Sequence, residues 1–179
     1  VEKPAGLLTV PGRGEGMDDC LAARILAEFP DARVVHRLDL DTSGLCVLAR
    51  GAAAQRHLGL QFERRRVGKR YLAVVSGGPS AEAGRIDLPI APDWPRRPRQ
   101  RIDPAGRPAV TDWRVLAREP GRTRLSLSPL TGRSHQLRLH CAVSGWPILG
   151  DPIYAEEAAY AAAPRMLLHA EVLALRHPE

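Results

Sequence analysis

The stretch Val34–Arg50, VVHRLDLDTSGLCVLAR, places charged side chains between two apolar runs. The flanking segments, residues 32–38 and 44–50, have the composition of β-strands. Between them, Asp39 and Asp41 lead into Thr-Ser-Gly, a sequence typical of a tight turn. A carboxylate at a strand end can act as a nucleophile, a general base or a metal ligand, but it can equally cap a turn. Both interpretations of Asp39 stay open here, whereas the position of Asp41 favours capping.

The composition indicates a folded globular protein. Of the 179 residues, 44% are hydrophobic and 26% are charged, which is not the profile of a disordered chain. No apolar run is long enough to cross a bilayer, and no signal-peptide pattern opens the chain. The three cysteines are far apart and lack ligand spacing, which predicts reduced thiols in a cytoplasmic protein. We expect a chain trimmed at both ends, since it lacks an initial methionine and stops just after an apolar run.

The net charge of +6 and the isoelectric point near 9.9 favour a polyanionic partner. Almost all basic residues are arginine, and the only lysines are Lys3 and Lys69. A solvated surface could explain either of the two basic clusters, but together with the net charge they favour contact with nucleic acid. The clusters are Arg64, Arg65, Arg66, Lys69 and Arg70, and Arg96, Arg97, Arg99 and Arg101.

Helix-like and strand-like segments do not alternate regularly along the chain. We therefore predict an α+β fold, a mixed, largely antiparallel sheet with flanking helices, in a single domain of residues 1–179. A proline- and arginine-rich segment, residues 91–108, is expected to be a loop or an irregular arm. Helices are predicted over residues 17–29, 52–66, 131–145 (starting near Thr131 or Ser134) and 156–163, and strands over 32–38, 44–50, 69–77, 84–90, 109–118, 123–130 and 166–175.

The segment TGRSHQLRLH, residues 131–140, is a second unusual stretch. Its leucines indicate that it is substantially packed, and a buried arginine needs an anionic partner. Asp39 is the natural candidate to pair with it. His135, His140 and Cys141 share the segment, but no second ligand cluster of matching spacing accompanies them, so no metal site is predicted.

Several other enzyme classes lack support. A glycosidase would need a second carboxylate in a comparable setting, and neither Asp112 nor Asp151 has distinctive surroundings in the sequence. A nucleophile elbow, a P-loop and a dinucleotide-binding fingerprint are all absent.

The segment HRLDLDTSGLCVLAR resembles the signature of RNA pseudouridine synthases of the RluA type. That pattern is His-Arg-Leu-Asp, two variable residues, Thr-Ser-Gly and an apolar run. The resemblance covers nearly the whole chain and includes EKPAGLLTVPG, KRYLAVVSG, GRPAVTDW, LTGRSHQLRLHCAVSGWPILGDPIYA and MLLHAEVLAL. Residues 87–109 further resemble the branch that modifies both tRNA and large-subunit ribosomal RNA.

The resemblance implies a single catalytic domain that detaches uracil from its ribose, turns the base and rejoins it through carbon five, without metal or organic cofactor. It implies that Asp39 is the essential carboxylate, which either attacks the sugar or stabilises charge and proton movements at the anomeric centre. Tyr71 matches a tyrosine that stacks on the target base, although a core aromatic would fit its setting equally. Arg138 matches an arginine that pairs with the catalytic carboxylate.

The expected partner is a stem-loop of tRNA (the anticodon loop), of 23S ribosomal RNA or of both, bound by a cytoplasmic monomer without a separate RNA-binding domain. Arg37 resembles a residue that enters the RNA near the extruded nucleotide, while Leu168 packs either against the base or in the core. Phosphate contacts are expected from Arg64, Arg65, Lys69, Arg96, Arg97, Arg99 and Arg133. The alternative function is a catalytically silent RNA-binding protein on the same fold.

Overall fold

The computed structural model describes residues 1–178 and divides them into two compact units. Unit 1 consists of Val1–Lys69 together with the described residues from Ala170 onward, and unit 2 is Arg70–His169. The chain crosses from one unit to the other within strands β5 (Gly68–Ser76) and β11 (Leu168–Ala174). Whether the units together form the single catalytic domain expected from the sequence stays a prediction.

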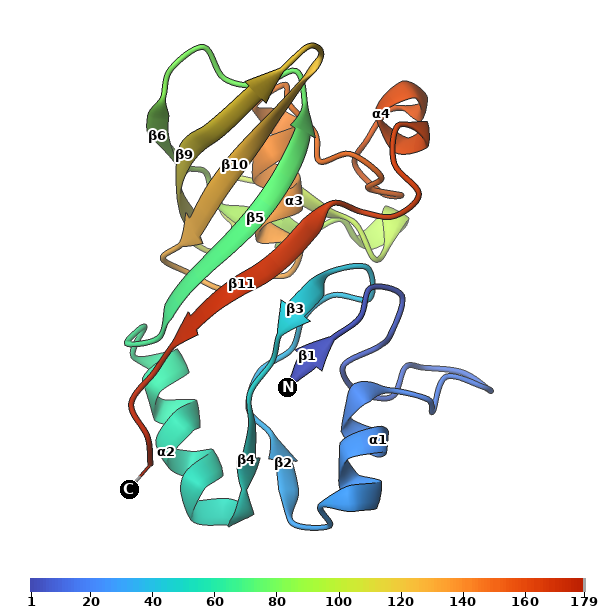
Figure 1. Cartoon of the computed structure of the whole chain (residues 1–179), viewed down its shortest axis with the longest axis vertical. Coiled ribbons are helices and arrows are strands. Elements are labelled where there is room, and N and C mark those ends of the chain that lie inside the picture. Colours follow the sequence, from blue (N-terminus) through green and yellow to red (C-terminus); the bar gives the residue numbers. More distant parts are fainter. Residues whose placement is uncertain (179) are drawn as a thin grey trace. The chain divides into compact units, whose positions relative to one another are not determined.

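Unit 1 contains two antiparallel strand pairs and two helices. β1 (Glu2–Lys3) pairs with β3 (Ser43–Leu45), and β2 (Ala32–Val34) pairs with β4 (Leu48–Arg50). The β2–β4 pair lies between α1 (Leu21–Glu28) and α2 (Gly51–Glu63), as Figure 1 shows. β2 is shorter than predicted because the charged corner after it leaves the sheet pairing, and the second predicted strand is divided into β3 and β4.

Helix α1 begins later than the sequence predicts. Cys20 caps it, since its Sγ accepts a hydrogen bond from the Ala23 amide at 3.4 Å. Among the apolar side chains at this helix, Leu21 is buried, whereas Leu26 and Phe29 are exposed.

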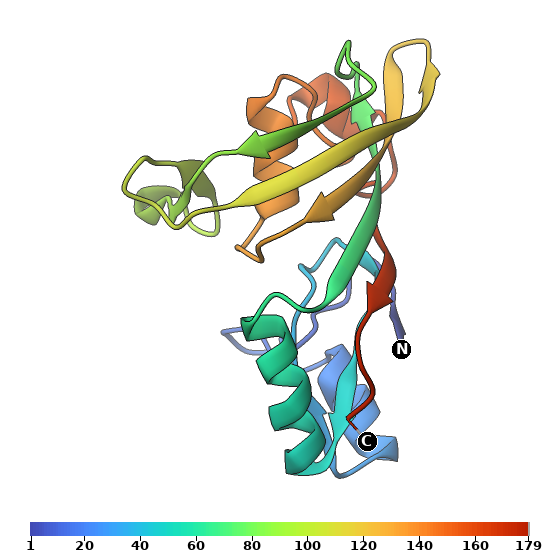
Figure 2. The same cartoon turned by 90° about the vertical axis from the view of Figure 1, so that its left-hand side faces the viewer.

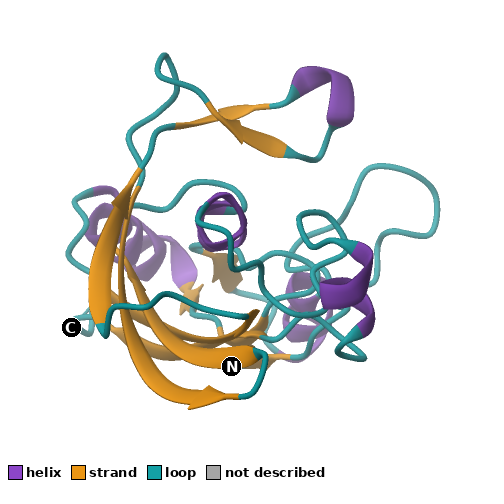
Figure 3. Ribbon diagram, turned by 90° about the horizontal axis from the view of Figure 1, so that it is seen from above, coloured by secondary structure: helices purple, strands orange, loops and turns teal. Residues whose placement is uncertain are grey.

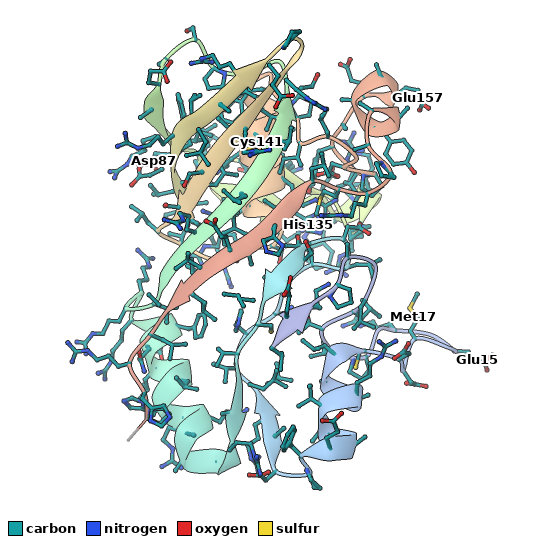
Figure 4. All side chains as sticks on the ribbon, in the orientation of Figure 1. Glu15, Met17, Asp87, His135, Cys141 and Glu157 are labelled. Carbon is teal, nitrogen blue, oxygen red and sulfur yellow. The ribbon has the colours of Figure 1, made fainter. Side chains whose placement is uncertain are left out.

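Unit 2 is built on four antiparallel strands in the order β5-β10-β9-β6, with α3 (Gln136–Val143) packed against them. In β10 (Arg122–Pro129) every second side chain from Thr123 to Pro129 is buried, which is the period expected for a strand with one face on a core. Figure 4 shows Cys141 on α3 behind the sheet, and this thiol belongs to the main core cluster. The other elements are β6 (Ala83–Asp87), β9 (Val110–Glu119) and α4 (Glu157–Ala161).

The segment predicted as an irregular arm has regular structure. β7 (Ile90–Pro92) pairs with β8 (Gln100–Ile102), and a short 3-10 turn, η1 (Trp94–Arg96), joins them. We call residues 90–102 the arm. Figures 2 and 3 show it projecting away from the four-stranded sheet of unit 2.

Within residues 1–178, no helix is both long and apolar enough to cross a membrane. The predicted α+β class is confirmed, because helices accompany a mostly antiparallel set of strands.

Candidate active site and RNA interface

Asp39 lies in the corner between β2 and β3, in a segment that we call the signature loop (residues 36–44). The backbone of this loop is held on both sides of Asp39. Thr9 Oγ1 donates to the Leu38 carbonyl at 2.8 Å and accepts from the Leu38 amide at 3.1 Å. Beyond Asp39, the Leu40 carbonyl accepts from the Gly6 amide at 3.0 Å. The N-terminal segment therefore fixes where the carboxylate is presented.

Lys3 is a buried cation beneath the same loop. Its Nζ is fully enclosed and donates to the carbonyls of Pro4, Leu7 and Leu40 at 2.8, 2.6 and 2.9 Å. Burial lowers the pKa of Lys3, and the nearby charges of Asp41 and Asp39 oppose that shift. No role was predicted for Lys3 from the sequence, although it is one of only two lysines in an arginine-rich chain.

His36 holds the start of the signature loop as a neutral acceptor. Its Nε2 accepts from the Val47 amide at 3.1 Å, and its ring stacks on Phe62 with centroids 4.6 Å apart. Burial, assisted by the charge of Lys69, lowers the pKa of His36 to about 4. An uncharged ring committed to these contacts has a structural role.

The structure explains why the Thr-Ser-Gly turn ends in glycine, at Gly44. Its φ is +114°, and a Cβ at this position would lie 2.6 Å from the backbone nitrogen of Ala170. Both the backbone conformation and the close approach of β11 therefore exclude a side chain. Thr42 and Ser43 are buried beside it, whereas Arg37 is exposed.

Tyr71 and Leu168 meet at the main core cluster of unit 2. Tyr71 is half-buried near the start of β5, opposite Leu127 in the register, and shares its strand face with Ala73 and Val75. Leu168 is buried within the cluster. Tyr71 thus packs on the core and is only partly exposed.

Arg138 is paired with Asp151 inside unit 2. Its Nε and Nη2 donate to the two carboxylate oxygens at 2.8 and 2.6 Å, and both side chains are almost completely buried. Burial alone would raise the pKa of Asp151, but Arg138 and the amides of Ile153 and Tyr154 together hold it below its ordinary value. The carboxylate is thus ionised and keeps the guanidinium oriented.

The sequence correctly indicated that Arg138 is buried and paired with an anion, but it missed Asp151 as a partner. Asp39 and Arg138 belong to different units, so the predicted pairing between them stays a prediction.

Tyr154 connects this pair to the arm. The Arg138 guanidinium carbon lies 5.4 Å from the ring centroid, and the phenol oxygen accepts from the Gln100 amide at 2.8 Å. His135 Nδ1 is 2.9 Å from the same oxygen. His135 has a left-handed backbone with φ of +53°, which explains why α3 begins at Gln136 and later than predicted.

His140, on the buried side of α3, serves a hydrogen-bond network. Its Nδ1 is 2.9 Å from the Thr111 hydroxyl and its Nε2 is 3.0 Å from the Leu88 carbonyl, while burial lowers its pKa. Gln136 joins this network through Thr111 and Thr131. Throughout residues 1–178, no group of three or more His, Cys, Asp or Glu side chains is placed to hold a metal ion.

The predicted phosphate-binding residues occupy three places in the chain. Arg64 and Arg65 are exposed just after α2, with the less exposed Lys69 following them. Arg96, Arg97 and Arg99 belong to the arm. Arg133 precedes α3, and its Nε donates to the Pro108 carbonyl at 3.1 Å. The arm group and Arg133 share unit 2, whereas Arg37 and the group after α2 belong to unit 1.

Comparison with known proteins identifies the family. A family model described as RNA pseudouridylate synthase matches residues 1–143. The chain belongs to the RNA pseudouridylate synthase family. It is 49% identical over 180 aligned residues to the dual-specificity RNA pseudouridine synthase RluA of Escherichia coli (strain K12), covering 99% of this chain and 82% of that protein. The RluA protein of Yersinia pestis is 48% identical, with 100% of this chain and 88% of that protein covered.

Solved structures agree with this family assignment. Human RNA pseudouridylate synthase domain containing 1 superposes with a TM-score of 0.79 at 31% identity, over 96% of this chain and 80% of that one. Human RNA pseudouridylate synthase domain containing 4 gives 0.75 at 27% identity, over 96% and 78%. The family predicted from the signature is confirmed, and the enzyme is an isomerase that converts uridine in RNA to pseudouridine.

Proposed function

We propose that this pseudouridine synthase modifies specific uridines in stem-loops of tRNA (the anticodon loop), of 23S ribosomal RNA, or of both. The observation that supports the range of targets is the 49% identity, over 99% of the chain, to an enzyme named for dual specificity. The exposed arginines of the arm and of the segment after α2 supply sequence-independent contacts to phosphates, which position a folded RNA.

Asp39 is the reacting carboxylate in this proposal. The reaction breaks the bond between uracil N1 and the ribose, rotates the base and joins carbon five to the same ribose carbon. Carbon five loses its proton and N1 takes one up, so the product is an isomer of uridine. Asp39 either attacks the ribose carbon or stabilises charge there as the bond breaks. The observation that carries this assignment is the double clamp on the neighbouring backbone, by Thr9 at Leu38 and by Lys3 at Leu40, which holds the loop around Asp39 in a defined position.

Tyr71 and Arg138 are also proposed to take part in the reaction. A uridine must leave its stack to react, and stacking on the accessible part of Tyr71 offsets part of that cost. Arg138, which is oriented by Asp151, is proposed to supply a fixed positive charge that favours the ionised form of the reacting carboxylate.

The enzyme is proposed to act as a monomer in the cytoplasm. The three buried, unpaired cysteines fit a reducing compartment.

Replacing Asp39 with alanine tests the assignment. We expect Asp39→Ala to reduce isomerisation by on the order of 1,000-fold or more, because the reacting group is removed. RNA affinity should change little, since Asp39 adds a negative charge and no phosphate contact. The measurement is tritium release from RNA labelled at carbon five of uridine, with the Kd measured in parallel.

Asp41→Ala is the matched control. It removes the same charge from the same loop and should retain turnover, because Asp41 belongs to the turn. Retained tritium release by Asp39→Ala would refute the role of Asp39. An unsubstituted protein that binds RNA without releasing tritium would indicate the silent RNA-binding alternative.

A further inference from the structure

The arm exposes a tryptophan to solvent. Trp94 is 65% exposed, the largest exposed fraction of any large hydrophobic side chain among residues 1–178. The other two tryptophans, Trp113 and Trp146, pack edge to face with their ring centroids 5.7 Å apart, and both contribute to the core of unit 2. A single exposed hydrophobic side chain is common on protein surfaces, so the residues around Trp94 decide whether it contacts a partner.

Trp94 is held on a rigid turn. The Asp93 amide donates to the Arg99 carbonyl at 3.0 Å, and the Arg96 amide donates to the Asp93 carbonyl at 3.0 Å. The Asp93 carboxylate is buried and pairs with Arg96 at 2.8 Å. A second anchor, from the Gln100 amide to the Tyr154 hydroxyl, ties the arm to the rest of unit 2. The indole is therefore presented by a fixed backbone rather than by a loose loop.

The charge around the indole selects its partner. The Arg97 guanidinium carbon lies 3.9 Å from the centre of the Trp94 ring, so the cation covers one face and leaves the other accessible. Arginines outnumber acidic residues in the arm by four, at positions 96, 97, 99 and 101, to one, at Asp93. This combination of an open aromatic face and flanking cations is how proteins bind single-stranded nucleic acid.

We infer that Trp94 is a stacking platform for an unpaired RNA base, with Arg97 holding the indole from behind and contacting the adjoining phosphate. This inference deepens the proposed function and rests on it, since it needs an RNA with unpaired nucleotides. It adds a recognition site on the arm, separate from the Tyr71 position of the reacting uridine.

Fluorescence of the full chain tests the inference directly. The emission of exposed Trp94 is isolated as the difference between the unsubstituted protein and Trp94→Phe. We expect a stem-loop RNA with an unpaired loop to quench this emission and shift it. The same stem-loop with abasic nucleotides in the loop should not, because its phosphates are unchanged while its bases are missing.

Affinities provide the second measurement. Trp94→Ala should weaken stem-loop binding by ~5- to 100-fold, the range for one stacked base, while Trp94→Phe retains most of the affinity. Against the abasic RNA, Trp94→Ala should bind like the unsubstituted protein. Tyr160→Ala is the matched control, because Tyr160 is an exposed aromatic beside Glu156 and Glu157, outside the basic arm, and should leave binding unchanged.

Three results would overturn the inference. These are a Trp94→Ala variant that binds the stem-loop within twofold of the unsubstituted protein, equal quenching by the abasic and intact loops, and an emission shift that follows protein concentration without RNA. The last result would assign Trp94 to self-association. Tritium release by the unsubstituted protein reports on the proposed function independently, so failure of either proposal is recognised without the other.

Discussion

His36 illustrates how a residue in a functional signature can have a purely structural role. The ring accepts a hydrogen bond from Val47 and stacks on Phe62, and both contacts use the neutral form. Sequence alone could not separate this role from catalysis, because Val47 reaches the ring only when the signature folds back on itself, and Phe62 comes from α2, outside the signature.

The low pKa of His36 predicts a specific dependence of stability on pH. In the folded protein the pKa is about 4, against an ordinary value of 6.5. The unfolded chain binds the proton first as pH falls, so the contribution is fully present above about pH 6.5 and is lost progressively toward pH 4. We expect this residue to account for about 3 kcal/mol of unfolding free energy over that interval.

His36→Gln isolates this effect. Its amide oxygen can accept from Val47 but does not titrate, so its unfolding free energy should fall less between pH 7 and pH 4 than that of the unsubstituted protein. Chemical denaturation at a series of pH values measures the difference. Parallel curves for the two proteins would show that His36 does not contribute.

At the scale of elements, α3 depends on a carboxylate that follows it in the chain. Arg138 is thirteen residues from Asp151 in sequence, and the two meet because the chain after α3 folds back onto the helix. The leucines around Arg138 predicted its burial, and burial predicted an anion. The sequence could not identify Asp151 as that anion, because the path of a connecting segment is set by tertiary contacts.

Removing the charge of Asp151 alone should be costly. Asp151→Asn keeps an oxygen for the Ile153 and Tyr154 amides but takes the paired carboxylate away from the buried Arg138 guanidinium, so we expect a loss of about 3–5 kcal/mol in unfolding free energy. The double variant Arg138→Met with Asp151→Asn removes the buried cation as well and should lose less than Asp151→Asn alone. Urea denaturation followed by circular dichroism measures both, and strictly additive losses would contradict a coupled pair.

Most strands were predictable, and the failures have physical causes. β5, β9 and β10 are each eight or more residues long and rich in strand-forming residues, and their predicted bounds agree within about two residues. The arm was predicted as irregular because prolines and arginines obscure the short β7–β8 pairing. Within the candidate site, Asp39, Tyr71 and Arg138 were predicted from the resemblance. The roles of Lys3 and Thr9 depend on contacts with residues 37 and 29 positions away in the sequence, which no local pattern reveals.

At the scale of the whole molecule, the excess positive charge is unevenly available. Many arginines are occupied by carboxylates, among them Arg24, Arg50, Arg85 and Arg118. Arg64, Arg65 and Arg66 form no ion pair with any described residue. The net charge of +6 therefore understates how strongly particular surfaces attract phosphates.

Neutralising the arm arginines should change the salt dependence of RNA binding. We expect the combined change of Arg96, Arg97 and Arg99 to glutamine to weaken binding and to lower the slope of log Kd against log salt by about 2. The effect should be smaller than three full phosphate contacts because Asp93 already pairs with Arg96. Filter binding at several salt concentrations measures the slope. Arg24→Gln is the control, because Arg24 on α1 already pairs with Asp19 and its loss should leave the slope unchanged. An unchanged slope would make the arm a solvated surface.

The crossings at β5 and β11 make unit 2 one uninterrupted segment, while unit 1 is assembled from two. A ribosome builds the chain from its N-terminus, so every residue of unit 2 has been synthesised before β11 is complete. Gly44 meets its close neighbour Ala170 only when that strand exists. On a nascent chain, the arm is therefore synthesised before the signature loop gains Ala170 as a packing partner. The surface proposed to contact RNA is thus complete in sequence before the proposed reaction centre has all of its packing contacts.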